Sequence, residues 1–213
     1  MQFEEVDKQE KQDITDGAHT IKKNYYKLIT DSLLTYLQDL VYLLGGVILV
    51  LLLLFRIVVV SGPSMNNTLI DGDCLILLNN TFYRNPQQGD IIVASKASYD
   101  NGTPIVKRII ATEGQTVDID FVEGIVYVDG EPLVEDYTYT PTNLYEGVDF
   151  PLTVSPGCVF VMGDNRNISK DSRSPEIGLI DTREILGKAI FLVLPGTGKG
   201  AVARQYYRIG VLN

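Results

Sequence analysis

The pattern of apolar and polar positions divides the chain into three regions. The first 39 residues are mostly polar, and the first 16 of them carry six acidic side chains, so we interpret the beginning as a flexible tail leading into a helix. Residues 40–55 carry no charge, and with the apolar residues beyond Arg56 they reach the roughly 20 residues that a spanning helix needs. We therefore expect a tail and pre-membrane helix over residues 1–39, a transmembrane anchor over 40–57, and a further domain over 58–213.

The apolar run has two other interpretations. A buried helix of a soluble protein is one, although a domain of this size could hardly cover such a helix on all sides. A cleaved signal peptide is the other, but the preceding region of about 39 residues is longer than an ordinary signal peptide. Lys22, Lys23 and Lys27 precede the run, whereas the 20 residues after Arg56 contain no Lys or Arg. This asymmetry predicts a cytoplasmic N-terminus and an extracytoplasmic remainder.

Short apolar runs separated by turn residues follow the anchor, which is typical of an all-β domain. Turn chemistry such as Asp71-Gly72 and Asp129-Gly130 separates the runs. Residues 133–153 hold several aromatic side chains but show weak periodicity, so we expect a loop-rich insertion at about residues 117–157. The expected strands are residues 74–78, 91–94, 105–111, 116–121, 125–128, 159–162 and 186–194.

The net charge of −9 argues against a broad basic surface, so we expect no nucleic-acid partner. Cys74 and Cys158 both lie in strand-like apolar runs and lack the spacing of metal ligands. We interpret them as small buried apolar side chains, and a disulfide between them stays open if the compartment is oxidising. The sequence gives no reason to expect a metal or an organic cofactor.

Ser64 and Lys107 lie in two distinctive segments, SGPSM (61–65) and PIVKRII (104–110). A serine hydroxyl needs a base to act as a nucleophile, and a neutral lysine can replace the usual histidine. The only histidine, His19, precedes the apolar run. An unperturbed lysine is neutral about once in a thousand at pH 7.4, but burial between Ile105 and Ile109 on one strand face would lower its pKa. On spacing alone, a lysine that reaches solvent or pairs with a carboxylate is the commoner case.

Three segments, in order, resemble the bacterial type I signal peptidases over roughly residues 58–194. The first is SM at 64–65 with TL at 68–69 and GD at 72–73; the second is GDIIV at 89–93 with IVKRIIA at 105–111; the third is GDNR at 163–166 with DSR at 171–173. The resemblance implies a mainly β fold of the signal-peptidase/LexA-like type. A single N-terminal transmembrane helix would precede an extracytoplasmic antiparallel β-sheet domain with a small β-hairpin and loop insertion.

The resemblance also implies a serine endopeptidase with a Ser-Lys dyad, which removes N-terminal signal peptides from exported preproteins after small residues. Ser64 would be the nucleophile and Lys107 the general base, with the Ser64 backbone amide as an oxyanion donor. Gly62 stands where some members place a second donor, a serine hydroxyl, and it has no side chain to donate. The implied supporting residues are Ser169, which orients the lysine, the pair Asp171 and Arg173, which holds the loop, and Gly163 and Asp164. The candidate substrate-binding residues are Met65, Ile70, Leu75 and Val106.

The implied partners are signal peptides of exported preproteins, the lipid bilayer and the secretion translocase, at the plasma membrane. Two alternatives of other kinds stay open. One is a membrane-tethered β domain that binds or scaffolds exported proteins without chemistry. The other is a related Ser-Lys self-cleaving regulator, a class that is generally soluble and joined to a DNA-binding domain.

Overall fold

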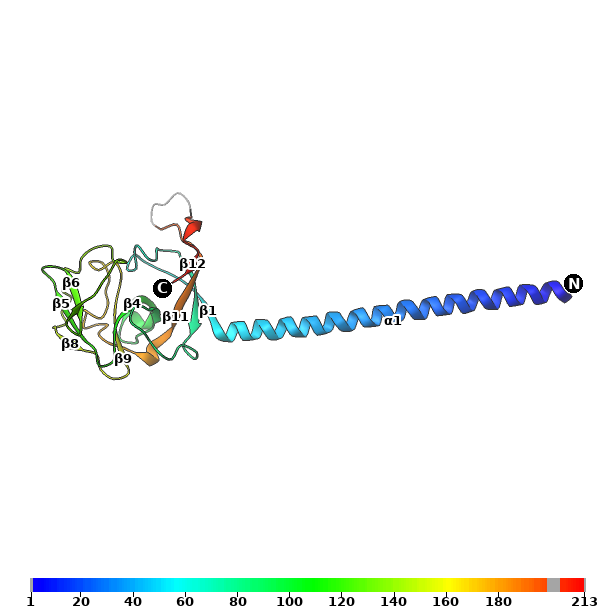
Figure 1. Cartoon of the computed structure of the whole chain (residues 1–213), viewed down its shortest axis with the longest axis horizontal. Helices are drawn as coiled ribbons and strands as arrows, with labels where there is room; N and C mark the ends of the chain where they lie inside the picture. Colours follow the sequence, from blue (N-terminus) through cyan, green and yellow to red (C-terminus); the bar gives the residue numbers. More distant parts are fainter. Residues whose placement is uncertain (1, 199–203, 213) are drawn as a thin grey trace. The chain divides into compact units, whose positions relative to one another are not determined.

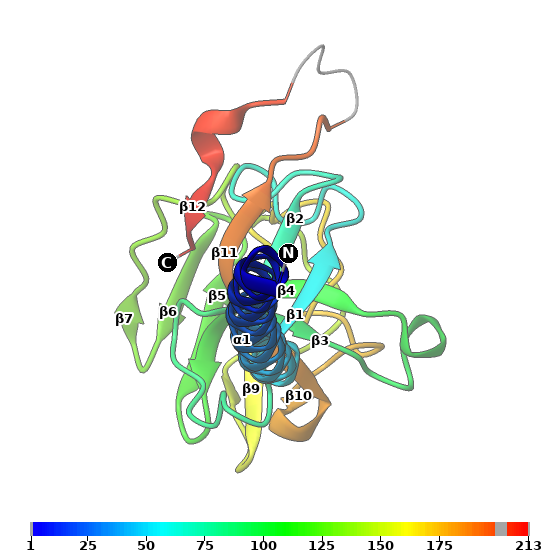
Figure 2. The same ribbon diagram turned by 90° about the vertical axis from the view of Figure 1, so that its right-hand side faces the viewer.

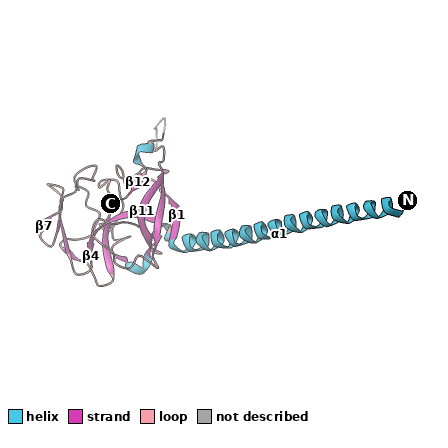
Figure 3. Cartoon of the chain, turned by 45° about the vertical axis from the view of Figure 1, so that its right-hand side comes forward, coloured by secondary structure: helices cyan, strands magenta, loops and turns pink. Residues whose placement is uncertain are grey.

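The computed structural model describes residues 2–198 and 204–212, with side chains omitted for most residues before Asp31. It consists of two compact units, residues 1–51 and 52–213. The first unit belongs to a helix and the second carries the β-strands, as the secondary-structure colouring shows (Figure 3).

Helix α1 runs from Gln2 to Leu54 and is 53 residues long (Figure 1). The acidic beginning of the chain, which we expected to be a flexible tail, is therefore helical. Within α1, residues 31–54 are long and apolar enough to cross a membrane, with a mean hydropathy of 2.3 and none of the apolar window buried. By length and composition this helix fits the expected anchor.

The helix ends three residues before the expected end of the anchor. Residues 55–57, which we assigned to the anchor, belong to strand β1 (Phe55–Val59). Strand β1 pairs antiparallel with β2 (Cys74–Asn79), with Ile57 opposite Ile76. The β-branched residues Ile57, Val58 and Val59 suit a pleated strand better than a helix, and the pairing supplies the hydrogen bonds that the helix would otherwise provide.

All seven strands expected from the sequence are present, each within one residue of its expected ends. The larger sheet has the order β1-β2-β11-β3-β4-β9-β10, and β12 also pairs with β11. The remaining strands of this sheet are β3 (Ile91–Ala94), β4 (Ile105–Thr112), β9 (Cys158–Met162), β10 (Ile180–Asp181), β11 (Ile185–Leu194) and β12 (Gly210–Val211). Within residues 2–198 and 204–212, three short 3₁₀ helices lie at Asp100–Gly102, Thr182–Glu184 and Tyr206–Arg208.

A smaller four-stranded sheet occupies the expected insertion. Its order is β7-β6-β5-β8, formed by β5 (Thr116–Asp120), β6 (Ile125–Val128), β7 (Glu131–Pro132) and β8 (Leu152–Thr153). Buried side chains of this sheet, including Val117 and Val126, pack with Ile110 and Phe160 of the larger sheet. The hairpin β5–β6 matches the expectation, and the loop-rich region expected at residues 133–153 contributes β8.

Strand β4 lies between β3 and β9 and carries the two cations that matter most for the site. It pairs with β3 along residues 105–108, whereas its pairing with β9 begins only at Arg108. A β-bulge follows between Ile109 and Ala111. Apart from Lys107 and Arg108, residues 105–111 of β4 are apolar on both faces, because the strand is buried in the middle of the sheet.

Both cysteines are free and only half-buried. Cys74 begins β2 and Cys158 begins β9. The expectation that they are small core side chains is therefore only partly met, and the disulfide left open by the sequence is not formed.

Candidate active site

The Ser64 and Lys107 side chains meet although 43 residues separate them in sequence. Lys107 Nζ donates a hydrogen bond to Ser64 Oγ at 3.0 Å. Ser64 lies in the turn between β1 and β2, and Lys107 lies in β4 opposite Ile92 of β3. The sheet therefore brings a hydroxyl and an amine within proton-transfer distance.

Burial lowers the pKa of Lys107. Only 5% of this residue is exposed. Desolvation of the ammonium lowers its pKa from 10.5 to about 8, against the opposing pull of the Asp171 and Glu146 carboxylates. Among the described residues, Lys107 forms no ion pair with a carboxylate. Its amine is thus far easier to deprotonate than that of a surface lysine.

The turn that carries Ser64 is fixed by buried side chains and by a neighbouring loop. Met65 and Leu69 are fully buried, and the Leu69 N–H donates to the Met65 carbonyl at 2.9 Å. Asn165 donates its backbone N–H to the Ser64 carbonyl at 3.0 Å and its side-chain amide to the Pro63 carbonyl at 3.1 Å. Asn165 was not among the expected site residues, although it lies inside the third matching segment.

Asp164 connects three segments through its carboxylate. It accepts two hydrogen bonds from Arg108, at 3.0 and 2.8 Å, and one from the Thr68 hydroxyl at 2.5 Å. Both charged side chains are buried, with 4% of Arg108 and none of Asp164 exposed. Arg108 also lies 4.0 Å from the centre of the Tyr137 ring. Asp164, which the resemblance implies as a supporting residue, thus joins β4 to the Ser64 turn. Arg108, Thr68 and Tyr137, which take part in these contacts, were not among the expected site residues.

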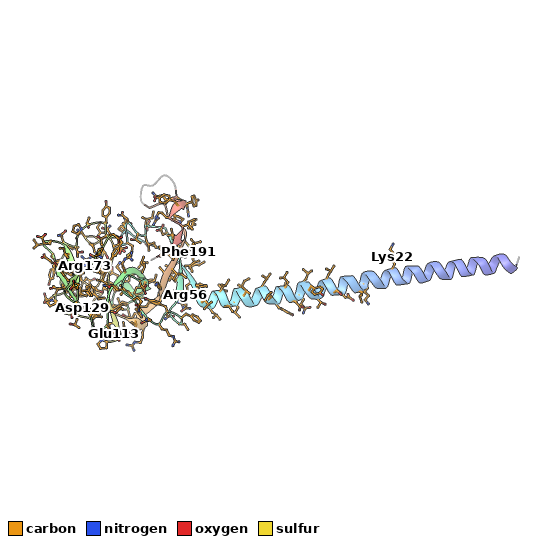
Figure 4. All side chains as sticks on the ribbon, viewed as in Figure 1. Lys22, Arg56, Glu113, Asp129, Arg173 and Phe191 are labelled. Carbon is orange, nitrogen blue, oxygen red and sulfur yellow. The ribbon has the colours of Figure 1, made fainter. Side chains whose placement is uncertain are left out.

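Asp171 and Arg173 form a second buried ion pair. Arg173 Nε donates to Asp171 Oδ1 at 2.8 Å and Nη2 donates to Asp171 Oδ2 at 2.9 Å. Asp171 also accepts the Gly163 N–H at 2.9 Å, and Arg173 donates to the Arg166 carbonyl at 2.6 Å. The pair therefore closes the loop 163–173 on itself, and Arg173 lies within the β unit (Figure 4).

Ser169 is buried in this loop, but its hydroxyl makes no hydrogen bond to any described residue. The expected bond to the Lys107 amine is therefore absent from this conformation. Gly163 explains how tightly the loop packs there: a side chain on this residue would collide with Ser169 and would lie 2.5 Å from the Ser64 carbonyl oxygen. Gly163 is required for close approach of the loop to the Ser64 turn.

The backbone N–H of Gly62 is already used. It donates to Asp71 Oδ1 at 2.8 Å, and Gly62 adopts a φ of +90°, which suits glycine. It therefore does not serve as an oxyanion donor in this conformation. The Ser64 N–H donates to no acceptor among the described residues, so it is free for a developing negative charge.

A cleft of about 560 Å³ opens beside Ser64 and Lys107. Val106, one of the candidate substrate-binding residues, lines it. Met65 and Leu75 do not line the cleft, because both are fully buried in the core. Ile70 lines a neighbouring pocket of about 300 Å³ that shares Gly62 with the cleft. The sequence did not single out the other cleft residues, which include Val58, Val59, Tyr99, Ile105, Ile168 and Lys170.

No cluster of three or more potential metal ligands occurs among residues 2–198 and 204–212.

The family model for signal peptidases, peptidase S26, matches residues 33–194. This chain belongs to the signal peptidase family. Probable signal peptidase I-1 of Synechocystis sp. is 40% identical to it over 167 residues, covering 72% of this chain and 81% of the relative. Signal peptidase I of Bacillus licheniformis is 31% identical over 190 residues, covering 85% and 96%. A crystal structure of a signal peptidase I from Enterococcus faecalis V583 is also similar, with 32% identity and a TM-score of 0.40 over 49% of this chain and 97% of that one.

Membership of the signal peptidase family gives the chain its reaction class, that of a serine endopeptidase. A mainly β domain preceded by one apolar helix agrees with the fold expected from the sequence.

Proposed function

We propose that this signal peptidase cleaves preproteins with Ser64 as the nucleophile and Lys107 as the general base. The single observation that carries the proposal is the 3.0 Å contact between Lys107 Nζ and Ser64 Oγ, made by an amine whose pKa is lowered to about 8. With that pKa, roughly one-fifth of the molecules hold a neutral amine at pH 7.4. The proton acceptor is therefore present at neutral pH.

The proposed reaction has two stages. Neutral Lys107 takes the hydroxyl proton while Ser64 Oγ bonds to the scissile carbonyl carbon, and the resulting ammonium then donates that proton to the leaving amine. This breaks the peptide bond, frees the mature protein and leaves the signal peptide esterified to Ser64. In the second stage Lys107 deprotonates a water that attacks the ester, and the Ser64 hydroxyl is restored. The Ser64 N–H stabilises the oxyanion in both stages, and a water or the Ser61 hydroxyl supplies the second donor.

The substrate binds as an added strand along β4. Residues 105–107 pair with β3 on one side, but β9 begins to pair only at Arg108. The other backbone edge of these residues has no strand partner among the described residues, and Ile105, Val106 and Lys107 line the cleft. An extended peptide on that edge gains main-chain hydrogen bonds, and the side chains of Val58, Val106 and Ile168 restrict the space for its own side chains. Small residues before the cut fit this restriction.

The apolar helix anchors the enzyme in the plasma membrane, with the N-terminus in the cytoplasm and the β domain outside. The lysines before the apolar window and the lack of basic residues for 20 positions after Arg56 support this orientation. The secretion translocase and the lipid bilayer are the proposed partners, because a signal peptide reaches the enzyme within the membrane.

Replacement of Ser64 or Lys107 by alanine tests the proposal directly. Membranes containing the full chain should process a reporter preprotein, and each variant should lose this processing while still folding. A matched control is Lys188→Ala, because Lys188 is also a strand lysine but is paired with Asp90 at 2.6 Å. Unchanged processing by the Ser64→Ala variant would leave only the non-catalytic alternative, which no observation in the described residues favours.

A further inference from the structure

The C-terminal segment, residues 204–212, contacts the turn that carries Ser64. Its Arg208 donates from Nη1 to Asp73 Oδ1 at 2.9 Å and from Nη2 to Asp73 Oδ2 at 2.6 Å. The same Nη2 donates to the Thr68 carbonyl at 3.0 Å. Asp73 is fully buried and the Arg208 side chain is 13% exposed, so this ion pair is largely removed from solvent. The segment 204–212 is therefore joined through Arg208 to the turn between β1 and β2.

Asp73 extends this contact to two further backbone groups. Its Oδ2 accepts the Ile70 N–H at 2.8 Å, and its Oδ1 accepts the Gly196 N–H at 2.7 Å. Gly196 has no room for a side chain, which would lie 2.6 Å from the Asp73 backbone nitrogen. The carboxylate thus holds together the end of the Ser64 turn, the end of β11 and the C-terminal segment.

Thr68 is the point at which two supports of the Ser64 turn meet. Its hydroxyl donates to Asp164 of the loop 163–173, and its carbonyl accepts from Arg208. The same loop holds the other end of the turn, where Asn165 donates to the Ser64 carbonyl. Removal of Arg208 would free one side of this turn and leave the other side bound.

We propose that Arg208 is a positioning residue that acts through Asp73 and Thr68 to hold Ser64 at proton-transfer distance from Lys107. This inference rests on the proposed role of Ser64. Arg208 does not line the cleft. An arginine suits the task because its rigid planar fork binds both oxygens of Asp73 while one of its nitrogens also reaches the Thr68 carbonyl. A lysine has no such fork.

The position of Arg208 is set by the short strand that follows it. Strand β12 pairs with β11, with Val211 opposite Phe191 and Gly210 opposite Leu192 (Figure 2). Leu212 packs against the core cluster that contains Met65 and Leu69. A two-residue strand holds a segment weakly, so the buried ion pair contributes to the docking as well as to the turn.

Steady-state kinetics of the full chain in lipid vesicles, with a preprotein substrate, test this role. We expect Arg208→Ala to lower kcat by about 10- to 100-fold, since a misplacement of about 1 Å can cost that much, and to leave KM nearly unchanged because the cleft is intact. Arg208→Lys should recover only part of kcat. Added methylguanidinium should raise the kcat of Arg208→Ala by refilling the site beside Asp73. The pH at which activity is half-maximal should not move, because Lys107 keeps its surroundings.

Arg183→Ala is the matched control, since Arg183 also forms a two-contact pair with an aspartate, Asp181, but is 89% exposed. Its kcat should equal that of the unmodified enzyme and should not respond to methylguanidinium. If Arg208→Ala unfolds, the double variant Asp73→Asn/Arg208→Ala removes the lone buried charge, and it should fold with a similarly low kcat.

A folded Arg208 variant with unchanged kcat would overturn the proposal, and so would a loss confined to KM. Failure of the proposed function itself looks different, because then Ser64→Ala retains processing whatever happens at Arg208.

Discussion

Two neighbouring residues of β4, Lys107 and Arg108, are both buried cations, yet their surroundings are opposite. Arg108 holds Asp164 through two hydrogen bonds, whereas Lys107 has the Ser64 hydroxyl as its neighbour and no carboxylate in contact among the described residues. Alternation along the strand turns the two side chains to different faces. The Arg108 charge is thus balanced by the Asp164 carboxylate, whereas the Lys107 amine on the other face has no carboxylate of the described residues in contact.

The same strand thus holds one buried cation that supports the fold and one that is suited to chemistry. A buried ion pair with good hydrogen bonds keeps its charges and fixes the loop that carries Asp164 and Asn165. A buried amine without such a pair loses its proton readily, which lowers the pKa of Lys107 to about 8. The nearby Asp171 and Glu146 carboxylates oppose this shift, but Asp171 is bound by Arg173, whose charge favours the neutral amine.

Lys107→Arg removes the difference between positions 107 and 108, because both would then carry a permanent cation. It should have the largest effect of the changes considered. An arginine stays protonated at any working pH and cannot act as a general base. We expect activity to fall by more than about 1000-fold, in the range found for loss of a residue that acts as a unit with its nucleophile. Cleavage of a preprotein by the purified full chain measures this, with Lys188→Arg as the control for the substitution itself. Appreciable cleavage by Lys107→Arg would show that the amine is not the base.

The free energies of unfolding of Arg108→Met and Lys107→Met should differ in opposite directions from that of the unmodified chain. Arg108→Met leaves the Asp164 carboxylate buried without its cation, so we expect the free energy of unfolding to fall by about 3 to 5 kcal/mol. Lys107→Met removes an amine whose folded pKa of about 8 lies below its ordinary 10.5, so at pH 7 it should raise the free energy of unfolding by about 3 kcal/mol. Calorimetry at pH 7 compares the two variants with the unmodified chain.

The sign of the lysine effect can be checked by repeating the calorimetry at higher pH. Below pH 8 the folded chain carries the full cost of the buried ammonium, and between about pH 8 and 10.5 the unfolded chain binds more protons than the folded one. The unmodified chain therefore gains stability over that interval, and the advantage of Lys107→Met should shrink. If the difference in free energy of unfolding between Lys107→Met and the unmodified chain does not change with pH, the Lys107 amine does not titrate in this range.

The cleavage activity should depend on the protonation state of the Lys107 amine. In the proposed mechanism only the neutral amine accepts the Ser64 proton. The value of kcat/KM should therefore rise with pH and reach half its limit near pH 8, falling about tenfold for each pH unit well below that value. A pH series on the purified enzyme measures the midpoint. A midpoint near 10.5 would mean that burial does not lower the pKa of Lys107 in the working enzyme.

The strands and the contact between Ser64 and Lys107 could be predicted from the sequence, because both depend on local patterns. Apolar runs bounded by turn residues mark the strands, and the segments around Ser64 and Lys107 match a known family box by box. The end of the anchor could not be predicted, since the apolar run resumes at Ile57–Val59 directly after Arg56. Only its pairing with β2 shows that it is a strand.

The supporting contacts were less predictable because they join residues far apart in the chain. Thr68 and Asp164 are 96 residues apart, and Asp73 and Arg208 are 135 apart. Sequence also does not separate a pocket wall from a core side chain, since both are apolar. Met65 and Leu75 proved to be core, whereas Val106 lines the cleft.

Ser169→Ala is the mildest change and tests whether the loop 163–173 also acts directly on the reacting pair. The Ser169 hydroxyl is buried without a hydrogen bond in this conformation, so its removal should change the free energy of unfolding by no more than about 1 kcal/mol. If the hydroxyl turns to the Lys107 amine during the reaction, as the family resemblance implies, kcat should nevertheless fall, by about tenfold or more. Calorimetry and kinetics on the same preparation separate the two effects. Ser172→Ala is the control, because the Ser172 hydroxyl accepts the Val161 N–H at 2.9 Å, so its loss should reduce stability with a smaller effect on kcat. If Ser169→Ala keeps full kcat, the hydroxyl only fills space beside Gly163, and burial alone prepares Lys107 for its role.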